Sequence, residues 1–243
     1  MTKVRADVLL QQRGLVESRT KAQALILAGS VVAGDHRVEK PGQLLDDGIA
    51  LRLKEQLKYV SRGGLKLEAA LDHFGLSPQD RVCADLGAST GGFTDVLLQR
   101  GAAKVYAVDV GYGQLHPKLR GDPRVVVHER VNARELSPKL LGETCAAAVA
   151  DLSFISLRLV LPALVSLLRP QDAWICVLVK PQFEAGRKEV GKGGVVRDPA
   201  VHRRVVDEIG QEVQRLGLRL LGSVESPLEG PAGNREFLVA GVV

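Results

Sequence analysis

The sequence has few cysteines and few aromatic residues, and it lacks long apolar runs. Its three cysteines, Cys83, Cys145 and Cys176, are far apart, and each lies in or beside an apolar segment. This spacing gives no Cys-x-x-Cys motif for a metal or for redox chemistry, and an odd number of cysteines suits a reducing compartment. We therefore expect three small core residues and no metal site.

Two further absences concern the location of the protein. The N-terminus carries Lys3, Arg5 and Asp7 and lacks the apolar segment of a secretory signal. No stretch approaches the roughly 18 unbroken apolar residues that a membrane-spanning helix needs. These features predict a soluble protein of the cytoplasm with no membrane partner.

Neither sign of charge is in large excess. The chain has 33 Lys and Arg against 28 Asp and Glu, which gives a net charge of +5 and a pI near 9.2. Residues 1–60 carry 10 basic and 7 acidic side chains, so a net charge of +3 lies in this quarter of the chain. A mildly basic protein fits a polyanionic partner, but charge alone does not identify one.

The length of 243 residues and the hydrophobic content of 45% allow one large domain and one small domain. We predict that they span residues 1–58 and 59–243. In the small domain we expect two short helices, the second beginning after Ser18 and ending at Gly29, and short strands at residues 30–35 and 49–53. A unit with so few elements has a weak core and is expected to depend on its neighbour or on a partner.

In the large domain, apolar β-branched runs alternate with helix-like stretches. Strands are expected at residues 82–86, 105–109, 125–128, 146–152 and 174–179, with helices such as 93–100 and 157–168 between them. This alternation predicts a parallel sheet that is covered by helices on both faces. Only a short turn joins the last two strands, residues 218–225 and 236–243, which suits antiparallel pairing. We therefore expect an α/β fold with a mostly parallel, seven-stranded sheet whose last strand is antiparallel.

The strongest motif is the glycine-rich turn at residues 85–94, Asp-Leu-Gly-Ala-Ser-Thr-Gly-Gly-Phe-Thr, which leaves the first strand of the sheet and enters a helix. Glycines at this point let a cofactor approach the backbone closely. Asp85 would repel the phosphates of a dinucleotide, whereas it suits the positive sulfonium and ammonium groups of S-adenosylmethionine. Asp109 ends the next strand, where an acid accepts hydrogen bonds from ribose hydroxyls.

The motif thus predicts a site for S-adenosylmethionine at the carboxyl edge of the sheet. We expect the cofactor to contact Asp85, Gly87, Ala88, Ser89, Thr90, Gly91, Gly92, Phe93, Thr94, Asp109, Val110, Asn132 and Asp151.

Four charged residues form a second candidate site. Asp151 and Lys180 close predicted strands, Glu236 begins the last strand, and Lys66 precedes the sheet. Charged residues at the ends of apolar strands point into the crevice at the carboxyl edge, and several of them together favour a functional site. Methylation of a hydroxyl group requires a base, and a nearby lysine lowers the pKa of another lysine by repulsion. We expect Lys180 to be the base and the other three residues to tune it and to orient a ribose.

Short blocks along nearly the whole chain resemble those of one family, the TlyA family. The blocks at residues 5–7, 18–19, 28–29 and 40–42 are similar to the S4 signature, and those at residues 59–67, 151–156, 180–184 and 194–198 to TlyA-type blocks. The family joins an S4-type α+β RNA-binding domain to an FtsJ-like class I methyltransferase domain of Rossmann type. The resemblance implies 2′-O-methylation of cytidines in ribosomal RNA by a Lys-Asp-Lys-Glu tetrad, which falls on Lys66, Asp151, Lys180 and Glu236.

The expected partner is therefore ribosomal RNA in free form or in ribosomal subunits. The candidate RNA contacts are Arg5, Arg19, Lys21, Arg62, Arg187, Lys188 and Arg197. Residues 183–197 contain four glycines and resemble a mobile basic loop that clamps a substrate. With three Tyr and five Phe, base stacking is sparse, and its candidates are Phe154 and Phe183. Monomer and homodimer both stay open.

Several other functions were weighed. A base-nitrogen methyltransferase would carry prolines after its fourth strand, but Asp151-Leu-Ser-Phe has none, and it would need neither lysine of the tetrad. A pyrimidine-carbon methyltransferase needs a cysteine in the crevice, and no cysteine occupies a loop there. An assembly factor without catalysis would not need an intact tetrad. Cell lysis, which a haemolysin name used in the family suggests, would need a membrane-active segment.

Overall fold

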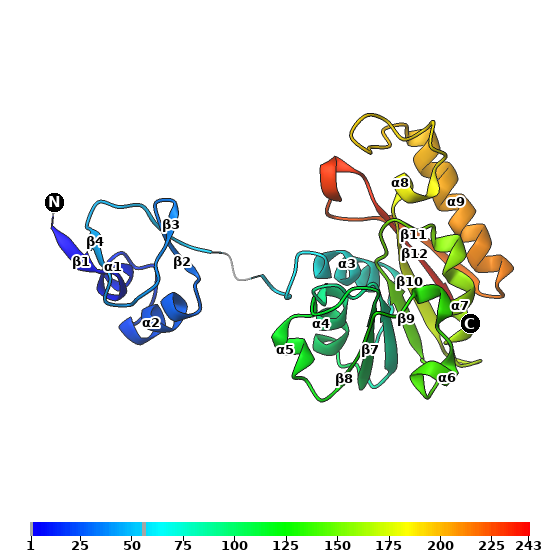
Figure 1. Ribbon diagram of the computed structural model, residues 1–243, viewed down its shortest axis with the longest axis horizontal. Coiled ribbons are helices and arrows are strands. Elements are labelled where there is room, and N and C mark those ends of the chain that lie inside the picture. The colour runs from blue at the N-terminus through cyan, green and yellow to red at the C-terminus, as the bar shows by residue number, and fades with distance from the viewer. Residues whose placement is uncertain (1, 55–56) are drawn as a thin grey trace. The chain divides into compact units, whose positions relative to one another are not determined.

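The computed structural model describes residues 2–54 and 57–243. The chain divides into two compact units, residues 1–57 and residues 58–243 (Figure 1). The boundary that we predict from the sequence lies one residue further along the chain. Among the described residues, no helix is both long and apolar enough to cross a membrane.

The described residues of the N-terminal unit form two helices and five short strands. Its elements are β1 (Lys3–Arg5), α1 (Ala6–Gln12), α2 (Arg19–Leu27), β2 (Val31–Ala33), β3 (His36–Arg37), β4 (Leu44–Asp46) and β5 (Leu51–Leu53). Strand β2 pairs antiparallel with β3 and β5, and β1 pairs antiparallel with β4. The Ser18 hydroxyl accepts a hydrogen bond from the Lys21 amide (3.2 Å), so the predicted N-cap of α2 is confirmed.

The second unit is built on one seven-stranded sheet. Its strands are β6 (Val82–Leu86), β7 (Lys104–Asp109), β8 (Val125–Glu129), β9 (Ala147–Ala150), β10 (Trp174–Val179), β11 (Arg219–Glu225) and β12 (Phe237–Val242). They lie in the order β11-β12-β10-β9-β6-β7-β8. The pairs from β8 to β10 are parallel, and β12 is antiparallel to both of its neighbours. The predicted fold class is confirmed.

Helices cover both faces of this sheet (Figure 1). They are α3 (Gly64–Phe74), α4 (Gly92–Gln99), α5 (Pro117–Arg120), α6 (Pro138–Leu141), α7 (Leu161–Ser166), α8 (Pro181–Glu184) and α9 (Pro199–Arg215), with 3₁₀ turns η1 (Ala133–Glu135), η2 (Leu157–Leu159) and η3 (Pro231–Gly233). Alternate residues of each strand enter two apolar cores. In β10, Ile175 and Val177 pack with α7 and α9, whereas Cys176 and Leu178 pack with α3 and α4.

The three cysteines are fully buried in these cores, as predicted. Burial raises the pKa of the Cys176 thiol to about 12, because the thiolate would have no solvent around it. The thiols therefore act as small apolar side chains.

Two differences from the predicted elements concern the loop after β9. The strand expected at residues 146–152 ends at Ala150, so Asp151 lies in a loop. The helix expected at residues 157–168 is divided into η2 and α7. Pro162 has no amide hydrogen to continue a preceding helix, and it accordingly lies in the first turn of α7.

Candidate functional site

The glycine-rich turn between β6 and α4 brings the chain against the loop that follows β9. Gly87 has a φ of 79°, and a Cβ atom at this position would lie 2.4 Å from the carbonyl oxygen of Asp151. Gly91 has a φ of 96° and caps α4. Only glycine fits both the positive φ and the close contact at residue 87.

Asp85 lies behind this turn and is fully buried. Its Oδ2 accepts a hydrogen bond from the Thr94 hydroxyl (2.6 Å), and its buried Oδ1 has no partner among the described residues. Burial raises the pKa of Asp85 to about 7, with a further contribution from the charge of Asp151, whereas the Thr94 hydrogen bond lowers it. A cation near this carboxylate would favour its ionised form.

Asp109 ends β7 and orders the loops around it. Its Oδ2 accepts a hydrogen bond from the Ser89 amide (2.8 Å) and its Oδ1 accepts one from the Gly111 amide (2.7 Å). Asp109 lines a cavity of about 530 Å³ together with Val110, Asn132 and residues 151–155. An ionised carboxylate can accept further hydrogen bonds from a ligand in this cavity.

A second cavity, of about 260 Å³, shares Gly87, Ser89, Asp151 and Ser153 with the first. Lys180 lines the second cavity only. Ten of the thirteen cofactor residues expected from the sequence line one cavity or the other: Gly87, Ala88, Ser89, Thr90, Gly92, Phe93, Asp109, Val110, Asn132 and Asp151. The other three, Asp85, Gly91 and Thr94, support the turn from behind.

The lining residues that were not predicted from the sequence include Ser61, Gly63, Gln114 and Ser153. Three of them lie in the sequence blocks at residues 59–67 and 151–156, so the blocks were a usable signal. Gln114 receives a hydrogen bond from the Ser89 hydroxyl (3.2 Å), and nothing in its local sequence indicates this role.

The four tetrad residues form two ion pairs. Lys180 Nζ lies 2.6 Å from Asp151 Oδ1, and it donates a hydrogen bond to Ser153 Oγ (3.0 Å). Lys66 Nζ, at the start of α3, lies 2.5 Å from Glu236 Oε2, and the Glu236 side chain is fully buried.

The sheet register brings the two pairs together. Val179 of β10 lies opposite Phe237 of β12, so the adjoining residues Lys180 and Glu236 are neighbours across the two strands. A buried carboxylate requires a positive partner, which Lys66 provides for Glu236. The result is a cluster of two lysines and two carboxylates, with Lys180 at the cavity wall.

The candidate RNA residues of the N-terminal unit are organised by one buried acid. Asp7 accepts hydrogen bonds from Arg5 (3.0 Å), Arg19 (2.8 Å) and Gln23 (2.9 Å). The Arg5 guanidinium in particular holds the pKa of Asp7 well below its usual range, although burial opposes this effect. Both arginine side chains are about half exposed. Lys21 is exposed on α2.

The other basic candidates lie on the surface of the second unit. Arg62, Arg187, Lys188 and Arg197 are exposed, and none of them pairs with a carboxylate in the described part of the chain. Phe154 is 90% exposed at the larger cavity, and its ring centroid lies 5.2 Å from that of Phe183.

Comparison with known proteins agrees with this geometry. The family model for the S4 domain matches residues 4–48, and that for the FtsJ-like methyltransferase matches residues 59–242. The chain is 51% identical over 239 residues to YqxC of Bacillus subtilis, whose name describes it as a candidate rRNA methyltransferase; the match covers 98% of this chain and 85% of that protein.

Two other relatives match nearly the whole chain. The 16S/23S rRNA (cytidine-2′-O)-methyltransferase TlyA of Mycobacterium tuberculosis is 50% identical, over 98% of this chain and 89% of that protein. A solved structure from Streptococcus thermophilus, named as a candidate hemolysin, is 47% identical with a TM-score of 0.74, and the match covers 99% of this chain and 88% of that one. The chain therefore belongs to the TlyA family, in which an FtsJ-like methyltransferase domain follows an S4 domain.

Proposed function

We propose that this protein transfers the methyl group of S-adenosylmethionine to the ribose 2′-hydroxyl of a cytidine in ribosomal RNA. The observation that carries the proposal is the position of Lys180. Its amine lies at the wall of the smaller cavity. This cavity adjoins the larger one, which has the features of a nucleoside site. Membership of the TlyA family and the names of its relatives supply the substrate class.

The residues around the two cavities fit S-adenosylmethionine. Asp109 and Asn132 would hold the adenosine part in the larger cavity, and the Gly87 turn would admit the methionine part close to the backbone. The orphaned Oδ1 of buried Asp85 would then have a positive charge nearby. The bound cofactor supplies an electrophilic methyl group.

The tetrad would handle the proton of the ribose hydroxyl. The hydroxyl proton must leave as the oxygen attacks, and the Lys180 amine in its neutral form accepts it at Nζ. Asp151, 2.6 Å away, then stabilises the ammonium ion that results. The Lys66–Glu236 pair fixes the neighbouring strand end beside Lys180; because it is buried and lines neither cavity, it would act on the ribose only through Lys180.

The N-terminal unit would position the RNA. Phosphate contacts from Arg5, Arg19 and Lys21 orient a nucleic acid without reading its sequence. Their half-exposed or exposed side chains are available for such contacts.

The test is methyl transfer to defined substrates. The protein is incubated with methyl-labelled S-adenosylmethionine and, separately, with free ribosomal RNA and each ribosomal subunit, and the RNA is then hydrolysed with alkali. We expect label in alkali-resistant dinucleotides, because a 2′-O-methyl group blocks cleavage of the adjacent linkage. Label in mononucleotides, or no label on any substrate, would overturn the proposal.

A further inference from the structure

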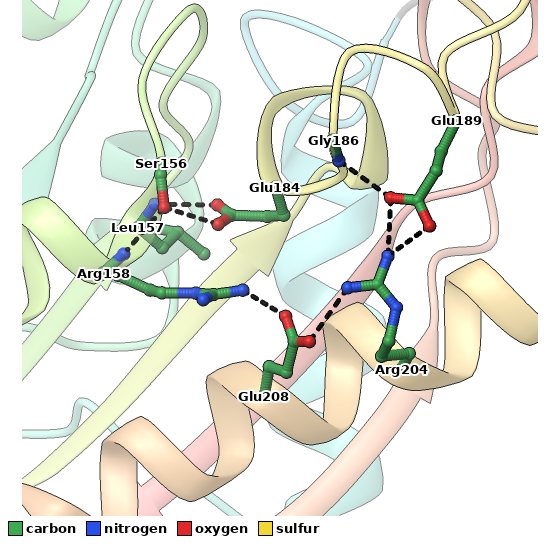
Figure 2. Close-up of polar contacts among 8 residues, drawn as sticks. All are labelled: Ser156, Leu157, Arg158, Glu184, Gly186, Glu189, Arg204 and Glu208. Carbon is green, nitrogen blue, oxygen red and sulfur yellow. Dashed lines mark hydrogen bonds and ion pairs between the residues drawn. The ribbon is translucent and has the colours of Figure 1, made fainter.

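Glu184 lines neither cavity, yet it joins the two segments that carry Asp151 and Lys180. It ends the single-turn helix α8, four residues after Lys180. Its Oε2 accepts a hydrogen bond from the Ser156 hydroxyl (2.6 Å), and its Oε1 accepts one from the Leu157 amide (2.7 Å), as Figure 2 shows. The carboxylate therefore fixes the far end of the segment that begins at Asp151.

This segment has little structure of its own. Residues 152–156 form no helix or strand, although residues 152–155 line the larger cavity. Their five backbone amides donate no hydrogen bond within the described part of the chain. Phe154 has a φ of 64°, a conformation that L-residues adopt only at a cost. Such a segment keeps one conformation only when neighbouring groups hold it.

The segment is held at two points, by Lys180 directly before α8 and by Glu184 at its last residue. Lys180 donates to Ser153 Oγ (3.0 Å) at the first point, and Glu184 binds Ser156 and Leu157 at the second. Helix α8 begins at buried Pro181, which fixes φ at its first residue. The two points of attachment therefore keep a constant separation, and Asp151 and Ser153 stay beside the Lys180 amine.

A second set of contacts is made by Arg158, which directly follows this segment, on its exposed side. Arg158 pairs with Glu208 of α9, Glu208 also pairs with Arg204 (2.9 Å), and Arg204 pairs with Glu189 (2.6 Å) (Figure 2). The Arg158–Glu208 contact is solvent-exposed, whereas both Glu184 hydrogen bonds are partly buried. Exposed ion pairs stabilise less than partly buried hydrogen bonds to a charged group, so Glu184 is the stronger attachment.

The environment of Glu184 is unusual for a surface acid. Burial raises the pKa of its carboxyl group, whereas the hydrogen bonds from Ser156 and Leu157 lower it. An acid that is retained where burial opposes its charge is typical of a functional region.

We infer that Glu184 is a positioning residue for methyl transfer: it holds residues 151–157 so that Asp151 and Ser153 meet Lys180 beside the cofactor cavity. The expected effect of Glu184 on methyl transfer rests on the proposed function. Its expected hold on residues 151–157 does not.

The test compares three variants of the full chain. Glu184→Ala removes both hydrogen bonds. Glu184→Gln keeps an oxygen for the Leu157 amide and gains an NH₂ group that can donate to the Ser156 hydroxyl. Glu208→Ala removes a carboxylate from the exposed side of the same segment and is the matched control. Each variant is measured for kcat, for S-adenosylhomocysteine affinity, for thermal unfolding and for amide hydrogen exchange of residues 151–157.

We expect Glu184→Ala to lower kcat about 10- to 100-fold, as for a displaced catalytic group, and to speed exchange in residues 151–157. Glu184→Gln and Glu208→Ala should stay close to the wild type in both measurements. The inference would be overturned if Glu184→Ala had the same kcat and the same amide exchange as the wild type. It would also be overturned if Glu208→Ala lost as much kcat as Glu184→Ala. If the wild type transfers no methyl group to RNA, the proposed function fails, and the exchange data still decide whether Glu184 holds the segment.

Discussion

At the scale of single residues, the chemistry depends on a few charges that the fold holds close together. Lys180 is the only tetrad lysine that lines a cavity in the described part of the chain, and it is held by Asp151 and Ser153. Lys66 and Glu236 pair behind it. In the proposed reaction Lys180 handles the proton, and the buried Lys66–Glu236 pair supports it without lining either cavity.

Replacement of Lys180 tests this role. Lys180→Ala should lower the rate of transfer by roughly 10²- to 10⁴-fold, which is the usual contribution of a general base. Affinity for S-adenosylhomocysteine should stay nearly unchanged, because Lys180 does not line the larger cavity that is proposed to hold the adenosine part, although it lines the smaller one. Single-turnover kinetics and titration calorimetry measure the two quantities. A loss of cofactor binding as large as the loss of rate would show that Lys180 holds the cofactor instead.

Asp85 links cofactor binding to stability. Because burial raises its pKa to about 7, above the ordinary carboxyl value, its ionised form destabilises the folded state. This cost grows as the pH rises from about 4 to about 7 and is constant above that range. Asp85→Asn should therefore raise the free energy of unfolding of the ligand-free protein, by at most about 4 kcal/mol at pH 8, and by less at pH 5.5.

The same variant should bind S-adenosylhomocysteine and, more markedly, S-adenosylmethionine less tightly, since it lacks the charge that suits a sulfonium group. Urea unfolding at the two pH values and calorimetry with both ligands make the test. A stability change of the same size at pH 5.5 and pH 8 would contradict the assigned ionisation.

Single residues also show what sequence can and cannot predict. The acids at the ends of β6 and β7 follow a local pattern, so Asp85 and Asp109 could be found. The pairing of Lys66 with Glu236 joins residues 170 positions apart. Both residues belonged to the predicted four-residue site, but neither the strand pattern nor the resemblance indicated that they pair with each other. Glu184 was overlooked because its partners, Ser156 and Leu157, lie on another loop.

At the scale of elements, the turn between β6 and α4 lies close to the loop after β9, and the two line the cavities proposed for the cofactor. Strands β6 and β10 have the predicted bounds, because continuous apolar runs define them. Strand β9 ends earlier than predicted, because Leu152 and the residues after it leave the sheet to line the larger cavity. Apolar character alone does not distinguish a strand from a cavity wall.

A pair of glycine variants tests this turn. Gly87→Ala places a Cβ atom 2.4 Å from the Asp151 carbonyl oxygen, whereas Gly75→Ala, at a similar φ of 66°, places one in open space. Both should lose about 1–2 kcal/mol of stability from the left-handed backbone. Only Gly87→Ala should also lose S-adenosylhomocysteine affinity, by tenfold or more (~1.4 kcal/mol). Equal affinity in the two variants, measured by calorimetry, would show that the close approach is not needed for binding.

At the scale of the whole molecule, the chain divides into two compact units, which match the S4 and the FtsJ-like methyltransferase models. The composition and the change of pattern near residue 59 predicted two units, and the alternation of strands and helices predicted the class of the larger one. The S4 class of the smaller unit was predicted only from the resemblance to a family. The small excess of charge in residues 1–60 was a weak indicator of RNA binding. The structure adds that Asp7 holds Arg5 and Arg19 in place, which no sequence pattern indicated.

Salt dependence tests the role of the N-terminal unit. Arg19→Ala should weaken binding to ribosomal RNA and reduce the slope of log K against log salt by about 1, which corresponds to one lost phosphate contact. Its cofactor affinity should equal that of the wild type. Arg215→Ala, which removes an exposed arginine paired with Glu212 on α9, is the matched control. The same slope in both variants would remove Arg19 from the RNA-binding surface.

The central claim is that the methyl group goes to a ribose oxygen of cytidine with Lys180 as the base. The most direct measurement is mass spectrometry of nucleosides from ribosomal RNA that was treated with the protein and S-adenosylmethionine. We predict 2′-O-methylcytidine after treatment with the wild type and at least about 100-fold less after the same time with Lys180→Ala. A methyl group on a base, or 2′-O-methylcytidine formed equally by both proteins, would contradict the claim.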